Sequence, residues 1–76
     1  MTPTKSERPD GIIEYRVNGL LHREDGPAVE RPNGILEWFR NGAPHREDGP
    51  AVEYPNGSKE FYDNGVLIAV VESTGL

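Results

Sequence analysis

The sequence predicts an all-β protein, an antiparallel meander of short strands built from stacked 23-residue β-hairpin repeats with little or no helix. Two observations predict it. A segment of nine residues that begins at His22 returns letter for letter at His45, which marks an internal repeat. Glycines that follow Asn or Asp recur every seven or eight residues, and turns so close together leave no room for a helix of ordinary length.

The repeat divides the chain into units. Shifting the sequence by 23 residues aligns 12–34 with 35–57, and 16 of the 23 aligned positions are identical. A third unit begins at residue 58, but Ile68 stands where the His-Arg-Glu-Asp-Gly segment is expected. We therefore predict a disordered tail over 1–8 and a single β-repeat domain over 9–76, made of repeats 12–34 and 35–57 and of a half repeat and cap over 58–76.

Short strands are predicted between the turns. Ile12–Val17 and Ile35–Arg40 are rich in β-branched and aromatic residues and partly alternate with polar ones, as half-buried strands do. Val29 and Val52 are expected to form an apolar column. Alternation also predicts two further columns on opposite faces: Tyr15, Trp38 and Phe61 inside, and Glu14, Glu37 and Glu60 outside.

Size and composition limit what the chain can do. With 76 residues and 34% hydrophobic residues, the chain is near the lower limit for folding around its own core. It has no Cys, which excludes disulfides and thiolate metal sites. Self-association is therefore an alternative source of stability.

The charge narrows the class of partner. The net charge is −5, which disfavours direct contact with nucleic acid or an anionic membrane and suits a basic protein surface. The longest apolar run, Val66–Val71, is far shorter than a membrane span. We expect a soluble, cytoplasmic protein whose partner is another protein.

One segment resembles a known family. From Trp38 to Lys59 the chain has an aromatic strand, Asn-Gly, a His, a short strand and Pro-Asn-Gly. This order, at a period of 23, resembles the MORN-type β-hairpin repeat over roughly residues 9–67, as a variant in which His-Arg-Glu-Asp-Gly-Pro replaces the usual His-Gly-x-Gly. The resemblance implies elongated sheets of stacked hairpins and non-catalytic binding roles: scaffolding, protein contacts and affinity for phospholipid.

His22 with Asp25, and His45 with Asp48, are the residues that would suit a catalytic or metal site. Both pairs belong to the identical segment, and Asp before Gly commonly stabilises a turn. No Ser, Thr or Lys recurs beside them as a nucleophile. We predict a structural role, no enzymatic activity and no metal or cofactor, with a metal-dependent site at these pairs as an alternative.

The residues predicted to meet a partner fall into three groups. The first is the charged loop segment, which the repeat displays twice, and the alternative for it is mutual surface pairing. The second is an acidic strip, with a solubilising face as its alternative. The third is a half-exposed aromatic row. The loop group is Arg23, Glu24, Asp25, Arg46, Glu47 and Asp48; the strip is Glu14, Glu37, Glu60, Glu30 and Glu53; the row is Phe39 and Tyr62.

These features predict a non-catalytic protein-binding module. We expect a small acidic inhibitor or adaptor that covers a basic, nucleic-acid-handling surface of a larger protein, and an anti-defence protein of a phage or mobile element would be one example. The alternative is a structural protein that assembles with itself, as a homodimer or longer stack, through Val66–Val71 or the Phe39/Tyr62 row.

Overall fold

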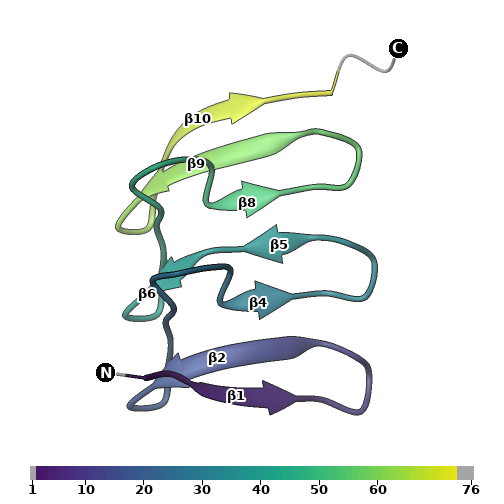
Figure 1. Ribbon diagram of the computed structural model, residues 1–76. Helices are drawn as coiled ribbons and strands as arrows, with labels where there is room; N and C mark the ends of the chain where they lie inside the picture. Colours follow the sequence, from purple (N-terminus) through teal and green to yellow (C-terminus); the bar gives the residue numbers. More distant parts are fainter. Residues whose placement is uncertain (1, 74–76) are drawn as a thin grey trace.

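The computed structural model describes residues 2–73, which form an antiparallel all-β structure without a helix (Figure 1). The predicted fold class is therefore confirmed. The molecule is elongated, with extents of 39 × 27 × 16 Å. Its strands are β1 (Thr4–Glu7), β2 (Ile13–Val17), β3 (Leu20–Leu21), β4 (Val29–Glu30), β5 (Leu36–Glu37), β6 (Phe39–Arg40), β7 (Ala43–Pro44), β8 (Val52–Glu53), β9 (Lys59–Asp63) and β10 (Val66–Val71).

The main sheet follows the chain from one edge to the other, in the order β1-β2-β4-β5-β8-β9-β10. Each neighbouring pair in this order is antiparallel. The short strand β3 pairs with β2, and β7 pairs in the same way with β6. Figure 1 shows the resulting ladder, with β1 at the bottom and β10 at the top. The topology is the predicted meander.

The first strand lies in the segment that was expected to be a disordered tail. Instead, Thr4–Glu7 pairs with β2 along its whole length, with Ser6 opposite Glu14. Val29 takes the same place opposite Glu37 in the next unit. Residues 6–11 lie 23 positions before 29–34 and share Glu, Arg, Pro and Gly with them. The tail boundary was misplaced because these residues already belong to the repeated strand and turn.

Two kinds of Asx-Gly turn end the strands. In the pair Asn18-Gly19 both residues have positive φ, 52° and 80°, and Asn41-Gly42 and Asn64-Gly65 match it. Two consecutive positive φ angles define the type I′ hairpin turn, for which Asn-Gly is the favoured sequence. In the Pro-Asx-Gly turns only the glycine has positive φ. There the Asx side chain accepts the amide two residues on, as Asn33 Oδ1 does from Ile35 N at 3.2 Å.

Strand register places glutamate and valine in one row on the same face of the sheet. Val29 lies opposite both Glu14 and Glu37, and Val52 lies opposite both Glu37 and Glu60. Directly paired residues share a face, so the two valines do not form the separate column that was expected. We call this face the glutamate face. Tyr15 and Trp38, which adjoin Glu14 and Glu37 in sequence, belong to the opposite face by alternation, which we call the arginine face.

The core is thin. Among the described residues the buried hydrophobic side chains are Ala28, Val29 and Ala51. Ala28 donates its amide to Glu37 O and accepts from Tyr15 N, both at 2.8 Å, so it ties the first unit to the second. At the far edge, all six residues of Val66–Val71 are exposed. A sheet that buries so few side chains needs further stabilising contacts, and the loops provide hydrogen bonds, ion pairs and cation–π contacts.

Candidate functional site

The loop between β3 and β4 folds around Arg23. The guanidinium lies 3.9 Å from the centroid of the Tyr15 ring, a distance at which cation–π attraction is effective. Its Nε donates to Asp25 Oδ1 at 3.1 Å, and its Nη1 donates to Pro27 O and Glu30 Oε2 at 3.1 and 3.2 Å. The Arg23 side chain is 22% exposed, so this residue is held inside its own loop.

The second loop repeats the arrangement around Arg46. The guanidinium lies 3.9 Å from the Trp38 ring centroid and donates to Asp48, to the Pro50 carbonyl and to Glu53 at 3.2, 3.1 and 2.8 Å. Of the predicted loop group, the two arginines thus pair with their own chain. Glu30 and Glu53, predicted to join the acidic strip, lie on the arginine face and are neutralised there.

The glycine in each loop has a packing role. Gly26 is absent from the residues with positive φ, so its Asp-Gly pair differs from the hairpin turns. A Cβ at Gly26 would lie 2.9 Å from Arg23 Cζ, and one at Gly49 would lie 3.0 Å from Arg46 Cζ. The loop backbone therefore passes close over the guanidinium, and glycine permits the approach.

The acidic residues of the loops are the most exposed part of the two segments. The side chains of Glu24 and Asp25 are 83% and 88% exposed, and those of Glu47 and Asp48 are 74% and 88% exposed. Asp25 and Asp48 each contact the arginine below, Glu24 contacts His22 at 3.3 Å, and Glu47 contacts Arg40 at 2.9 Å. The structure thus brings these four predicted site residues together on two matching loops, where a partner can reach them.

A groove of about 510 Å³ lies between the two loops, and both acidic tips line it together with Trp38 and Arg40. His45 also lines it and is 9% exposed. Its Nε2 is buried without a hydrogen-bond partner, and the Glu47 carboxylate is 3.6 Å away. Because Nδ1 accepts a hydrogen bond, Nε2 carries the proton, and the nearest carboxylate to it is that of Glu47.

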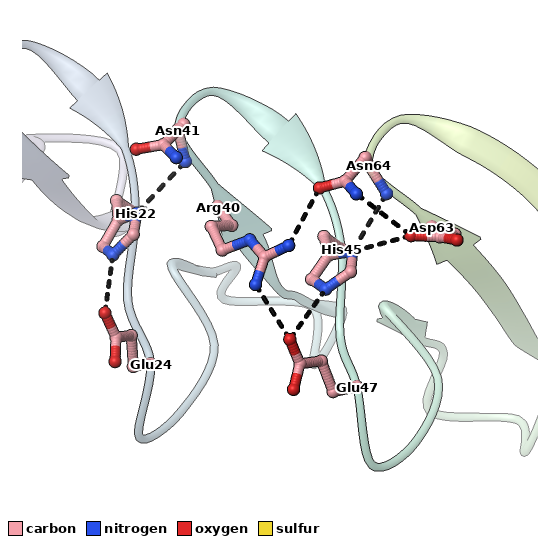
Figure 2. Close-up of polar contacts among 8 residues, drawn as sticks. All are labelled: His22, Glu24, Arg40, Asn41, His45, Glu47, Asp63 and Asn64. Carbon is pink, nitrogen blue, oxygen red and sulfur yellow. Dashed lines mark hydrogen bonds and ion pairs between the residues drawn. The ribbon is translucent and has the colours of Figure 1, made fainter.

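The two histidines join consecutive units (Figure 2). His22 Nδ1 accepts the backbone amide of Asn41 at 3.1 Å, and His45 Nδ1 accepts that of Asn64 at 2.9 Å. Leu21 O and Pro44 O accept the next amides, those of the turn glycines, at 2.9 and 2.8 Å. The type I′ turns at Asn41-Gly42 and Asn64-Gly65 are therefore each clamped by the unit before them. We call these contacts the histidine clamps.

The His/Asp pairs that were considered for metal or catalysis are not paired with each other. Asp25 and Asp48 contact arginines, whereas His22 and His45 face Glu24 and Glu47 (Figure 2). Over residues 2–73 no group of three or more His, Asp or Glu side chains is arranged to hold a metal ion. The same residues include no helix long and apolar enough to cross a membrane.

The predicted glutamate column is largely paired within the chain. Glu14 contacts Arg16 at 3.0 Å and Arg8 at 3.6 Å, and its side chain is 16% exposed. Glu37 is 17% exposed and accepts from Arg31, which raises the pKa of Arg31, chiefly through this hydrogen bond. These two carboxylates do not form an open acidic strip.

Glu60 has a different environment. It accepts hydrogen bonds from the hydroxyls of Tyr54 and Tyr62 at 3.0 and 3.1 Å. These bonds, followed by desolvation and the carboxylate charge, raise the pKa of both tyrosines. The aromatic row lies beside them, since Phe39 and Tyr62 line a second groove on the glutamate face together with Tyr54 and Glu60.

Tyr54 was not predicted as a site residue. The repeat could have indicated it, because a shift of 23 residues aligns Tyr54 with Arg31 and Arg8. These two arginines contact Glu37 and Glu14. The histidine clamps were not predicted either, because a His that accepts an amide 19 residues ahead leaves no short sequence motif.

Comparison of the chain with models of known protein families found no match. Searches of curated proteins and of solved structures likewise found none.

Proposed function

We propose that the protein is a non-catalytic binding module that covers a basic surface of a larger protein, as an inhibitor or an adaptor. The observation that carries the proposal is the pair of matching loops, which hold Glu24, Asp25, Glu47 and Asp48 outward at 74–88% exposure. Their arginines are turned inward, so the outward charge of each loop is negative. Opposite charge on a partner would steer association.

A net charge of −5 over 76 residues supports the same reading of the partner. Proteins that handle nucleic acid carry basic surfaces of the complementary sign, and blocking such a surface requires no chemistry from the inhibitor. An anti-defence inhibitor from a phage or mobile element would act in this way. The MORN-like pattern of the sequence is consistent with a binding role.

The test is a pull-down from host lysate with the tagged chain at low and high salt, beside a variant carrying Glu24→Gln, Asp25→Asn, Glu47→Gln and Asp48→Asn. The amides keep hydrogen-bonding oxygens for Arg23 and Arg46 and remove four charges. We expect a basic partner that the wild type retains at low salt only and that the variant loses. A partner held equally by both proteins would overturn the proposal.

Self-assembly is a second candidate function, favoured by a specific observation at one edge of the sheet. The edge strand Val66–Val71 has no charged residue and is exposed throughout, whereas the opposite edge strand is Thr-Lys-Ser-Glu. Unpaired apolar edges pair with other strands, and charged side chains on an edge prevent this.

Light scattering over a range of concentrations separates this candidate from the first. Ile68 is 64% exposed and lies at the bulge of β10, where it pairs with no residue of β9. If β10 joins two copies, the mass should rise toward twice 8.4 kDa, and Ile68→Lys should return it to the monomer value. A mass that stays at 8.4 kDa at every concentration would exclude self-assembly.

A further inference from the structure

The glutamate face changes character from the first unit to the third. Each column glutamate has one neighbour six residues before it and another two residues after it. These neighbours are Arg8 and Arg16 for Glu14, Arg31 and Phe39 for Glu37, and Tyr54 and Tyr62 for Glu60. The number of cationic neighbours thus falls from two to one to none, while aromatic rings take their place.

The third glutamate therefore keeps its hydrogen bonds and has no cation of its own. Both oxygens accept from a tyrosine hydroxyl, and no lysine or arginine within residues 2–73 forms an ion pair with Glu60. In the first two units a guanidinium meets the carboxylate directly. A cation nearby favours the ionised form of a carboxylate, so the place beside Glu60 suits a cation from outside the chain.

A groove beside Glu60 has room for a basic side chain. The second groove, of about 260 Å³, is lined by Phe39, Tyr54, Tyr62 and the carboxylates of Glu37 and Glu60. Val52 is among its apolar lining residues. Aromatic faces attract ammonium and guanidinium groups, and apolar lining covers the aliphatic stem of a long basic side chain.

The chain itself already uses this chemistry on the opposite face. Arg46 lies over the Trp38 ring and contacts the Glu53 carboxylate at the same time, and Arg23 does the same with Tyr15 and Glu30. An aromatic ring together with a carboxylate is thus the arrangement by which this fold holds a basic side chain.

We propose that the groove around Glu60, walled by Phe39, Tyr54 and Tyr62, binds a lysine or arginine side chain of a basic partner segment. The inference deepens the function proposed above and rests on it for the basic nature of the partner. It adds a contact on the opposite face from the acidic loops, and the two surfaces can be tested separately.

The probe is a capped penta-lysine peptide, titrated into the isotopically labelled protein while the ring resonances of Phe39, Tyr54 and Tyr62 are followed by NMR. We expect saturable shifts at these rings, with Phe61, which lines neither groove, as the comparison. A penta-arginine peptide shows which cation fits better, and a penta-glutamate peptide should give no shift. Absence of shifts at the three rings with both basic peptides would overturn the proposal.

Two variants locate the site. Tyr62→Arg places beside Glu60 the residue that the first unit has beside Glu14, so the fold should accept it and the internal cation should block the groove. Glu60→Gln removes the charge and retains an acceptor oxygen. We expect each to weaken peptide binding about tenfold. Glu72→Gln, an exposed position outside the groove, removes the same charge and should have little effect. Equal weakening by all three would mean that only net charge matters, and would overturn the site.

The loop variant separates this proposal from the function on which it rests. Glu24→Gln with Glu47→Gln should leave the ring shifts at the groove in place while weakening capture of the basic partner. If Tyr62→Arg leaves partner capture and the peptide shifts unchanged while the loop variant abolishes capture, the groove proposal fails and the proposed function stands. If neither variant affects capture, the proposed function fails, and the peptide shifts still decide the groove.

Discussion

The first two units and the third unit complete the same hairpin in different ways. After the Asn-Gly turn, the chain of the first two units pairs for two residues, leaves the sheet as a loop and returns with Val-Glu. In the third unit β10 runs straight along β9, with one bulge at Ile68. Only the looped units carry the arginine over an aromatic ring, the histidine clamp and the acidic tips.

The loops therefore stabilise the fold in addition to the strands, and they give the surface its charge pattern. The loop residues Ala28 and Ala51 are fully buried, and each loop contributes several hydrogen bonds through one guanidinium. In the third unit, which has no loop, all residues of β10 are exposed.

Removing a loop arginine should have the largest effect. Arg46→Ala removes the contact with Trp38 and three hydrogen bonds and leaves Glu53 without its cation, so we expect a loss of about 2–4 kcal/mol in the free energy of unfolding. Arg40→Ala is the control, since Arg40 makes two exposed contacts and should cost about 0–1 kcal/mol. Urea unfolding measures both. Equal losses of stability in the two variants would contradict the claim that the contacts of Arg46 stabilise the fold more than those of Arg40.

Breaking one histidine clamp should have a smaller and more local effect. His45→Ala removes the acceptor for the Asn64 amide, and we expect a loss of about 1–2 kcal/mol. Amide hydrogen exchange should show faster exchange at Asn64 and little change at Asn41, which His22 still holds. An Asn64 amide that remains equally protected would show that His45 is not what protects it.

The tyrosines of the third unit should give the fold a pH dependence at high pH. Hydrogen bonding to Glu60 raises the pKa of Tyr54 and Tyr62 above the ordinary value of 10.0. A pKa that is higher in the folded state stabilises the fold below the unfolded value, and this contribution is lost as the pH rises through the folded value. An absorbance titration near 295 nm should move to lower pH in Glu60→Gln. An unchanged titration would contradict the role of Glu60.

The smallest effect is expected where one unit is converted to resemble the next. Arg16→Phe gives the first unit the residue of the second and leaves Glu14 with Arg8. Because Arg16 is 42% exposed, its ion pair should contribute about 0–1 kcal/mol. Thermal unfolding should therefore change by a few degrees at most. A much larger fall would mean that the two units are not equivalent at this position.

Much of the fold could be predicted from the sequence because its signals are local. Asn-Gly pairs specify type I′ turns through the backbone conformation that each residue tolerates, and the exact repeat of the segment from His22 to Glu30 gives the period. The start of β1 was missed because the strand Thr-Lys-Ser-Glu is polar and resembles a tail.

The site was harder to predict because its contacts are not local. Alternation correctly separates Glu14 from Tyr15, but it does not reveal that Arg31 neutralises Glu37 or that Arg23 turns inward onto Tyr15. Asp-Gly in the loops has the same letters as a hairpin turn, and Gly26 is required there by a guanidinium rather than by φ. Such contacts depend on how the loop crosses the sheet, which spacing alone does not specify.

The most direct test of the central claim compares two matched pairs of substitutions in binding to the recovered partner. Glu24→Gln with Glu47→Gln removes two loop charges whose side chains are 83% and 74% exposed, and Glu14→Gln with Glu37→Gln removes two charges whose side chains are only 16% and 17% exposed. We predict that the loop pair weakens affinity about tenfold and flattens its salt dependence, whereas the column pair leaves affinity unchanged and lowers stability. Equal affinity losses for the two pairs would contradict the claim that the loops present the binding charge.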